Sequence, residues 1–192
     1  MLHIAVDGFF LPDQVRESTV RWSSILGIDP GLRPPVTGNP LLRSGLALAG
    51  ANRRANDAGR GLLTALEIAG LDLWGTQLVA IAARGIASEQ AAVGQAVYAL
   101  RRSLVIAGAE SQFVNLWATD PRAATELTTA YYERLLAGEG RSEALRGVQL
   151  AMLRSESRSH PFYWAGFISI GARGPIAWAK SPEAAREISE SP

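Results

Sequence analysis

Residues 113–137 read FVNLWATDPRAATELTTAYYERLLA, in which a short apolar run is followed at once by a segment of helical periodicity. Thr119 or Asp120 can cap this helix, and a proline suits its first turn. The apolar stripe consists of Leu127, Ala130, Tyr131 and Leu135. The pattern predicts a strand over Phe113–Trp117 and a helix over Asp120–Ala137.

The same alternation of strand and helix patterns recurs along the chain. Further apolar runs without sustained polar alternation, as expected of strands covered on both faces, lie at Leu2–Val6, Leu78–Ala83 and Phe167–Ile170. Helical patterns run from Ser142, a plausible N-cap, through Met152, and from about Glu89 to a stop at Gly108. Strands alternating with helices predict an α/β layer fold with a mostly parallel sheet.

Two stretches lack regular periodicity and are predicted to be exposed loops. Residues 27–40, GIDPGLRPPVTGNP, contain four prolines and three glycines, and residues 51–61 combine paired arginines with asparagine, aspartate and glycine. The sequence after Pro175 is polar. We therefore predict one domain over residues 1–175 and a polar tail over residues 176–192.

Composition places the chain among ordinary globular domains. It has 192 residues, a net charge of +1, and 47% hydrophobic and 19% charged residues, a balance that excludes disordered and strongly nucleic-acid-binding classes. No apolar run approaches the roughly 18 residues of a membrane span, and the start MLHIAVDGFF lacks the basic region of a secretory signal. We therefore predict a cytoplasmic protein with no nucleic-acid or membrane partner.

No cofactor or metal site is expected. The chain has no cysteine, which excludes disulfides, thiolate metal sites and a cysteine nucleophile within it. Its two histidines, His3 and His160, lie too far apart in sequence for a local zinc motif, and no glycine-rich phosphate loop occurs. Four glutamates on or between the predicted helices have no convergent acidic partner: Glu126, Glu133, Glu139 and Glu143.

Four segments, in order, resemble the caspase-like CHAT domain, a bacterial relative of the caspases and separases. They are LHIAVDGFFLPD from Leu2, LVAIAARG from Leu78, GQAVYALRRSLVIAGA from Gly94 and HPFYWAGFISIG from His160. NLWATD and the helix TELTTAYYERLLAG, between the last two, are also similar to the family. The resemblance covers most of residues 1–173 and implies a three-layer αβα sandwich of the caspase type.

In that family the peptidase dyad is a histidine that closes LHFATHG and a cysteine within LSACETG, each just past the carboxyl end of a parallel strand. Aligning LHIAVDG with the first motif places Asp7 at the histidine, and aligning LVAIAARG with the second places Arg84 at the cysteine. The resemblance implies that His3 is the upstream histidine of the motif, with its side chain among packed residues. Both members of the dyad are therefore missing.

Asp7 and Arg84 cannot replace the dyad chemically. Cysteine-dyad hydrolysis needs a thiolate and an imidazole that moves protons near neutral pH, whereas an arginine stays protonated and an aspartate beside it is a weak base. Two interpretations stay open: an ion pair between Asp7 and Arg84, or a turn at Asp7–Gly8 with Arg84 in solvent. The nearby hydroxyls of Ser88 and Thr64 have no evident histidine or lysine partner, which argues against a serine mechanism.

The remaining candidate residues are expected to have structural roles. His160 precedes a strand, where a histidine usually satisfies a local hydrogen bond. Trp117 and Trp164 are expected to pack against the core, whereas Trp74, in the loop LDLWGTQ, is the candidate for exposure. Trp178 is a further tryptophan that could line a ligand groove. The doublets Arg53-Arg54 and Arg101-Arg102 could suggest phosphate contacts, but a net charge of +1 without interleaved aromatic residues favours solvated surface.

In the complete family fold, two strands and their helices precede the histidine strand, whereas Met1 stands two residues before His3. The resemblance therefore implies a domain truncated at its N-terminal side, or a fragment of a longer gene product. Leu2–Val6 would then be an apolar, uncharged sheet edge, which invites association.

The sequence thus predicts a catalytically inactive CHAT-type domain, a pseudopeptidase, that acts as a protein-interaction, regulatory or assembly module. We expect it to pair with a second copy or with a partner protein through the N-terminal edge strand. The alternative is a peptidase whose active site is completed by another chain or uses a non-thiol nucleophile.

Overall fold

The computed structural model describes residues 1–10, 39–51, 61–81 and 93–177. A four-stranded sheet lies at its centre, with the strand order β1 (Leu2–Ile4), β5 (Val79–Ile81), β6 (Ser111–Asn115) and β7 (Phe167–Gly171). The first three strands are parallel, and β7 runs antiparallel to β6. The prediction of a mostly parallel sheet is confirmed.

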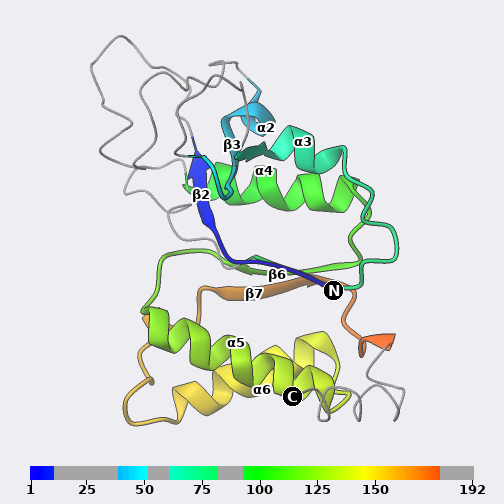
Figure 1. Cartoon of the computed structure of the whole chain (residues 1–192). Helices are drawn as coiled ribbons and strands as arrows, with labels where there is room; N and C mark the ends of the chain where they lie inside the picture. The colour runs from blue at the N-terminus through cyan, green and yellow to red at the C-terminus, as the bar shows by residue number, and fades with distance from the viewer. Residues whose placement is uncertain (11–38, 52–60, 82–92, 178–192) are drawn as a thin grey trace, which may run out of the picture.

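Helices cover both faces of this sheet (Figure 1). On one face lie α5 (Pro121–Leu136) and α6 (Arg141–Leu153), and on the other lies α4 (Val93–Ile106), with the short helices α2 (Pro40–Arg43) and α3 (Ala65–Ala69) packed against it. The chain therefore folds as the three-layer αβα sandwich that the sequence predicted.

A second, antiparallel sheet of three short strands was not predicted. It consists of β2 (Asp7–Phe10), β3 (Ser44–Ala47) and β4 (Leu62–Thr64). The predicted strand Leu2–Val6 was too long, because β1 ends at Ile4 and the chain passes into β2 at Asp7. Strands of three or four residues are too short to show an alternating pattern. The close packing of β3 on β4 depends on Gly45, where a Cβ would lie 2.3 Å from the Leu63 carbonyl oxygen.

The hydrophobic core between the sheet and helices α5 and α6 is built around aromatic side chains. Phe113 of β6 stacks on Tyr131 of α5, with ring centroids 4.6 Å apart, and on Phe167 of β7 at 5.5 Å. The opposite layer is aliphatic and includes Leu46, Ile68, Val79, Ile81, Leu100, Leu104 and Val114. Ile176, the first residue of the predicted polar tail, is fully buried in the aromatic layer, whereas residues 178–192 lie outside the described residues.

Local signals located α5 well and α6 less well. The Asp120 carboxylate accepts a hydrogen bond of 2.9 Å from the Ala123 amide, as a capping residue should. The predicted N-cap Ser142 is wrong, because α6 begins at Arg141 after Gly140. Backbone carbonyls after β7 accept from the amides of Arg141 and Ser142, at 3.3 and 3.4 Å, so no side-chain cap is needed there.

The predicted bounds of two other elements shift. The strand predicted over Phe113–Trp117 is β6, which lies two residues earlier, at Ser111–Asn115. Its first residues, Ser111 and Gln112, are polar yet buried, which hid the start of the strand from the hydrophobic pattern. Gly108 follows α4 with a φ of 98°, which confirms the predicted helix stop. The predicted start of this helix at Glu89 lies outside the described residues.

Candidate functional site

The two strands that should carry the dyad are neighbours. β1 pairs with β5 in parallel, with Leu2 opposite Val79 and Ile4 opposite Ile81, so their carboxyl ends meet at the same edge of the sheet. Asp7 follows β1 and is exposed. It is the first residue of β2, opposite Ala47, so Asp7 and Gly8 do not form the turn that was one of the two open interpretations. Arg84 lies outside the described residues, and its pairing with Asp7 stays a prediction.

His3 contacts helix α5 from the sheet edge. The Tyr132 hydroxyl and His3 Nδ1 are 3.0 Å apart, and the two rings meet edge to face with centroids at 5.6 Å. Burial, together with the neighbouring Tyr131, raises the pKa of Tyr132 to about 12, so its hydroxyl keeps its proton at neutral pH and can donate to Nδ1. His3 was expected among packed residues but is exposed, because β1 is the outermost strand of its sheet in the described part of the chain.

The candidate replacement nucleophile Thr64 has a structural role. Its hydroxyl caps α3, accepting from the Glu67 amide at 3.2 Å, while Glu67 Oε2 accepts from the Thr64 hydroxyl and amide at 2.7 Å. The T-x-x-E spacing of residues 64–67 is the sequence signature of such a capping box and could have located this helix. Ser88, the other candidate hydroxyl, lies outside the described residues.

His160 and the tryptophans behave largely as the sequence indicated. His160 Nδ1 accepts from the Phe162 amide at 3.2 Å, a local bond at a helical turn. The indoles of Trp117 and Trp164 are half-buried and donate to the Phe162 and Ser159 carbonyl oxygens. Trp74 is 85% exposed. Trp178 and the doublet Arg53-Arg54 lie outside the described residues.

The candidate charged residues do not form a joint acidic or basic site within the described residues. Three of the glutamates pair with arginines: Glu126 with Arg158 at 3.4 Å, Glu139 with Arg134 at 3.1 Å, and Glu143 with Arg146 at 4.0 Å. Glu133 and Arg102 are exposed, and Arg101 is half-buried. In the same parts of the chain, no three histidine, aspartate or glutamate side chains gather as a metal site would require.

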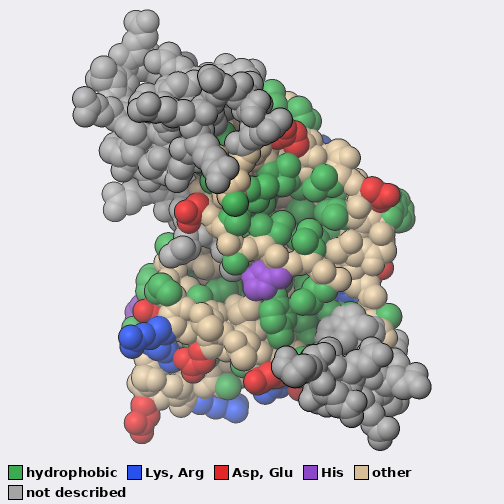
Figure 2. All heavy atoms as spheres, in the orientation of Figure 1, with side chains coloured by type: hydrophobic (Ala, Val, Ile, Leu, Met, Phe, Trp, Pro, Cys, Tyr) green, Lys and Arg blue, Asp and Glu red, His purple; other side chains and the backbone are tan. Residues whose placement is uncertain are grey.

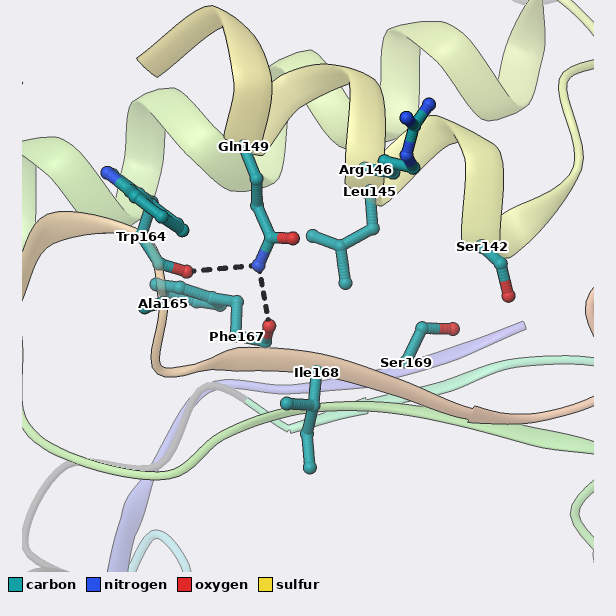
Figure 3. A pocket seen from close by; sticks show the side chains of 9 residues that line it. All are labelled: Ser142, Leu145, Arg146, Gln149, Trp164, Ala165, Phe167, Ile168 and Ser169. Carbon is teal, nitrogen blue, oxygen red and sulfur yellow. Dashed lines mark hydrogen bonds between the residues drawn. The ribbon is translucent and has the colours of Figure 1, made fainter. Parts of the chain in front are cut away.

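A groove of about 390 Å³ lies between α6 and β7 (Figure 3), and β7 is at the other end of the described four-stranded sheet from β1. The Ser142 and Ser169 side chains are at one end of it and Trp164 is at the other, with Leu145 between them. Gln149 spans the groove and donates to the carbonyl oxygens of Trp164 and Phe167, at 3.2 and 2.9 Å. The side-chain amide of Gln149 is therefore already hydrogen-bonded to the backbone at and just before the start of β7.

No described helix is long and apolar enough to span a bilayer.

Comparisons with known proteins agree with this geometry. The model of the CHAT domain family matches residues 1–172. Two curated relatives are tetratricopeptide repeat protein 28 of Homo sapiens, 34% identical over 111 residues, and its Mus musculus counterpart, 33% identical over 111 residues. The match covers 58% of this chain but only 4% of each relative. Because the family model spans nearly the whole described sandwich, the chain belongs to the CHAT domain family.

Proposed function

We propose that this chain is a catalytically inactive CHAT-family domain that acts as a protein-interaction module, in a regulatory or assembly role in the cytoplasm. The observation that carries the proposal is the chemistry at the dyad positions. Asp7 stands where the histidine is expected and Arg84 where the cysteine is expected, and the whole chain contains no cysteine. Neither side chain can supply a thiolate nucleophile or a proton shuttle near neutral pH.

The outer edge of β1 is the proposed contact surface. Among the described residues, no strand pairs with that edge, and residues 1–6, MLHIAV, carry no charged side chain. Exposed edge strands in natural proteins are usually protected by charges or covered, because their free backbone groups pair with other chains. Figure 2 shows hydrophobic side chains on both sides of a histidine on one face of the molecule. An extended partner strand is the ligand that such an edge recognises.

The curated relatives support an interaction context. Their name refers to tetratricopeptide repeats, and such repeats stack into extended concave surfaces that bind other proteins. The part of each relative that resembles this chain is a small share of its length. The interaction role of this chain therefore rests on its own edge strand and on the chemistry of its dyad positions.

We expect the purified chain to show no peptidase activity and no labelling by thiol-directed inhibitors, because it has no thiol to form a covalent intermediate. The measurement is hydrolysis of fluorogenic peptides with a basic residue before the scissile bond, alone and with candidate partner proteins. A matched variant, Asp7→Ala, should behave like the parent chain. Turnover that survives repurification and is lost in Asp7→Ala would overturn the proposal. It would show that the chain is a peptidase that uses a non-thiol nucleophile or that shares its active site with another chain.

We expect Asp7 and Arg84 to form an exposed ion pair. Because Asp7 is exposed, the pair should contribute only about 0 to 1 kcal/mol to the free energy of unfolding. Thermal or urea unfolding of Asp7→Asn, Arg84→Met and the double variant measures the coupling. Additive effects of the two single changes would show that the side chains do not interact.

A further inference from the structure

We propose that the partner of the β1 edge is a second copy of this chain, paired antiparallel about His3, and that acidification weakens the pair. This inference rests on the proposed interaction role of the edge and names its partner. Three features of β1 support it: the backbone groups that point outward, the side chains that would face one another in the pair, and the histidine among them, which can change charge.

The backbone of β1 presents alternate residues to the outside. The Leu2 amide donates to the Leu78 carbonyl oxygen at 2.9 Å, so Leu2 and, two residues on, Ile4 face β5. The Met1 carbonyl, the His3 amide and carbonyl, and the Ala5 amide therefore point away from the sheet. A two-fold pair of identical strands is antiparallel. The register that engages all three outward residues puts His3 opposite His3 and Met1 opposite Ala5.

The side chains match in this register. Leu2 of one copy lies opposite Ile4 of the other, on the side where both are half-buried against the aliphatic layer. Residues 1–6 contain no aspartate, glutamate, lysine or arginine, so no like side-chain charges oppose one another at neutral pH. A charged partner strand would find no complementary side chain on this edge. A copy of the same strand, which also carries no charged side chain, is therefore the partner whose side chains the edge fits.

His3 makes the pair sensitive to acid. Residues directly opposite in a hydrogen-bonded antiparallel pair have Cα atoms about 5.5 Å apart and side chains on the same face, so the two imidazoles become neighbours. From β5 the opposite residue is Ala80, and from α5 it is Tyr132, which holds Nδ1.

The carboxylates nearest in sequence to these groups are Asp7 and Glu133, both exposed, and among the described residues neither forms an ion pair with His3. Histidine gains its positive charge between about pH 8 and pH 5, so acidification places two like charges side by side, and no carboxylate of the described residues pairs with them.

The test is sedimentation equilibrium of the full chain, with any affinity tag placed after Pro192, at pH 8.0 and pH 5.5. We expect a dimer at pH 8.0 and a dissociation constant roughly 10- to 100-fold higher at pH 5.5, because a histidine that is protonated in the free chain must lose its proton before the two rings can pair. His3→Gln keeps a hydrogen-bonding group beside Tyr132 without a titratable ring. It should dimerise at both pH values. The control His160→Gln, at the other histidine, should keep the parent's pH dependence.

Ala5→Pro tests the edge directly. It removes one outward amide and should give a monomer with an unchanged melting temperature, because the Ala5 side chain is exposed and its amide does not face β5. A dimer that survives Ala5→Pro, or a pH dependence that survives His3→Gln, would overturn the inference. A monomer without peptidase turnover at pH 8.0 would overturn self-pairing alone, whereas turnover measured in the same samples would overturn the proposed function.

Discussion

Arg141→Met should lower the free energy of unfolding by about 3 to 5 kcal/mol, because it breaks a buried, charged hydrogen-bond network. The Arg141 side chain is 4% exposed. Its guanidinium donates to the Gln77 carbonyl oxygen, to the Ser111 hydroxyl at 2.8 Å and to the Gly174 carbonyl oxygen at 2.9 Å, and lies 3.8 Å from the Glu110 carboxylate. These partners adjoin β5, β6 and β7, so one side chain ties together three strands of the central sheet.

Urea unfolding measures the effect, and the melting temperature should fall by on the order of 10 °C for a domain of this size. Arg146→Met is the matched control on the same helix, since the Arg146 side chain is 70% exposed and pairs with Glu143 at 4.0 Å. That change should cost less than about 1 kcal/mol. Equal effects of the two substitutions would contradict the role of the buried network.

Phe113→Ala should cost about 3 to 5 kcal/mol, because it removes the central ring of the aromatic stack and leaves a cavity. Phe113 is 1% exposed and lies between Tyr131 and Phe167. The cavity would open where α5 meets the sheet, so its lining cannot collapse without moving the helix. Chemical unfolding of the purified variant provides the measurement.

Two controls separate the stack from aromatic residues in general. Phe162→Ala should cost less than about 1 kcal/mol, because that ring is 45% exposed. Tyr131→Phe should be nearly neutral, because no hydrogen bond of normal geometry reaches the buried Tyr131 hydroxyl. The same burial raises the pKa of Tyr131 to about 12, although nearby Ser169 and Arg141 oppose the rise. A large loss in either control would mean that the stack is not the main source of stability.

The parts of the fold that the sequence predicted correctly depend on local signals. Helix α5 was located because its cap, its apolar stripe and its first-turn proline are all within one segment. The parallel sheet followed from the alternation of buried strands with such helices. The small sheet of β2, β3 and β4 was missed, since each strand has only three or four residues and pairs with segments far along the chain.

The candidate site was likewise predicted where the signal is local and missed where the contact joins distant residues. The position of Asp7 just after β1 could be predicted from a motif, because a motif depends only on residues that are close together along the chain. The contact between His3 and Tyr132 joins residues 129 positions apart and has no sequence signal. The buried network of Arg141 was also missed, since polar residues usually indicate surface. Its buried location becomes visible only when the strands are placed beside one another.

The pairing of β1 with β5 has a consequence for how the protein is made. Leu2 pairs with Val79, which is synthesised 77 residues later (79 minus 2). At 5 to 20 residues per second, the apolar segment MLHIAV therefore stays without its native neighbour for roughly 4 to 15 s on the ribosome. Contacts between β5, β6, α5, α6 and β7 are closer in sequence and carry a smaller loop-closure cost. The strand that is outermost in the described part of the sheet is therefore also the strand that waits longest for its neighbour during translation.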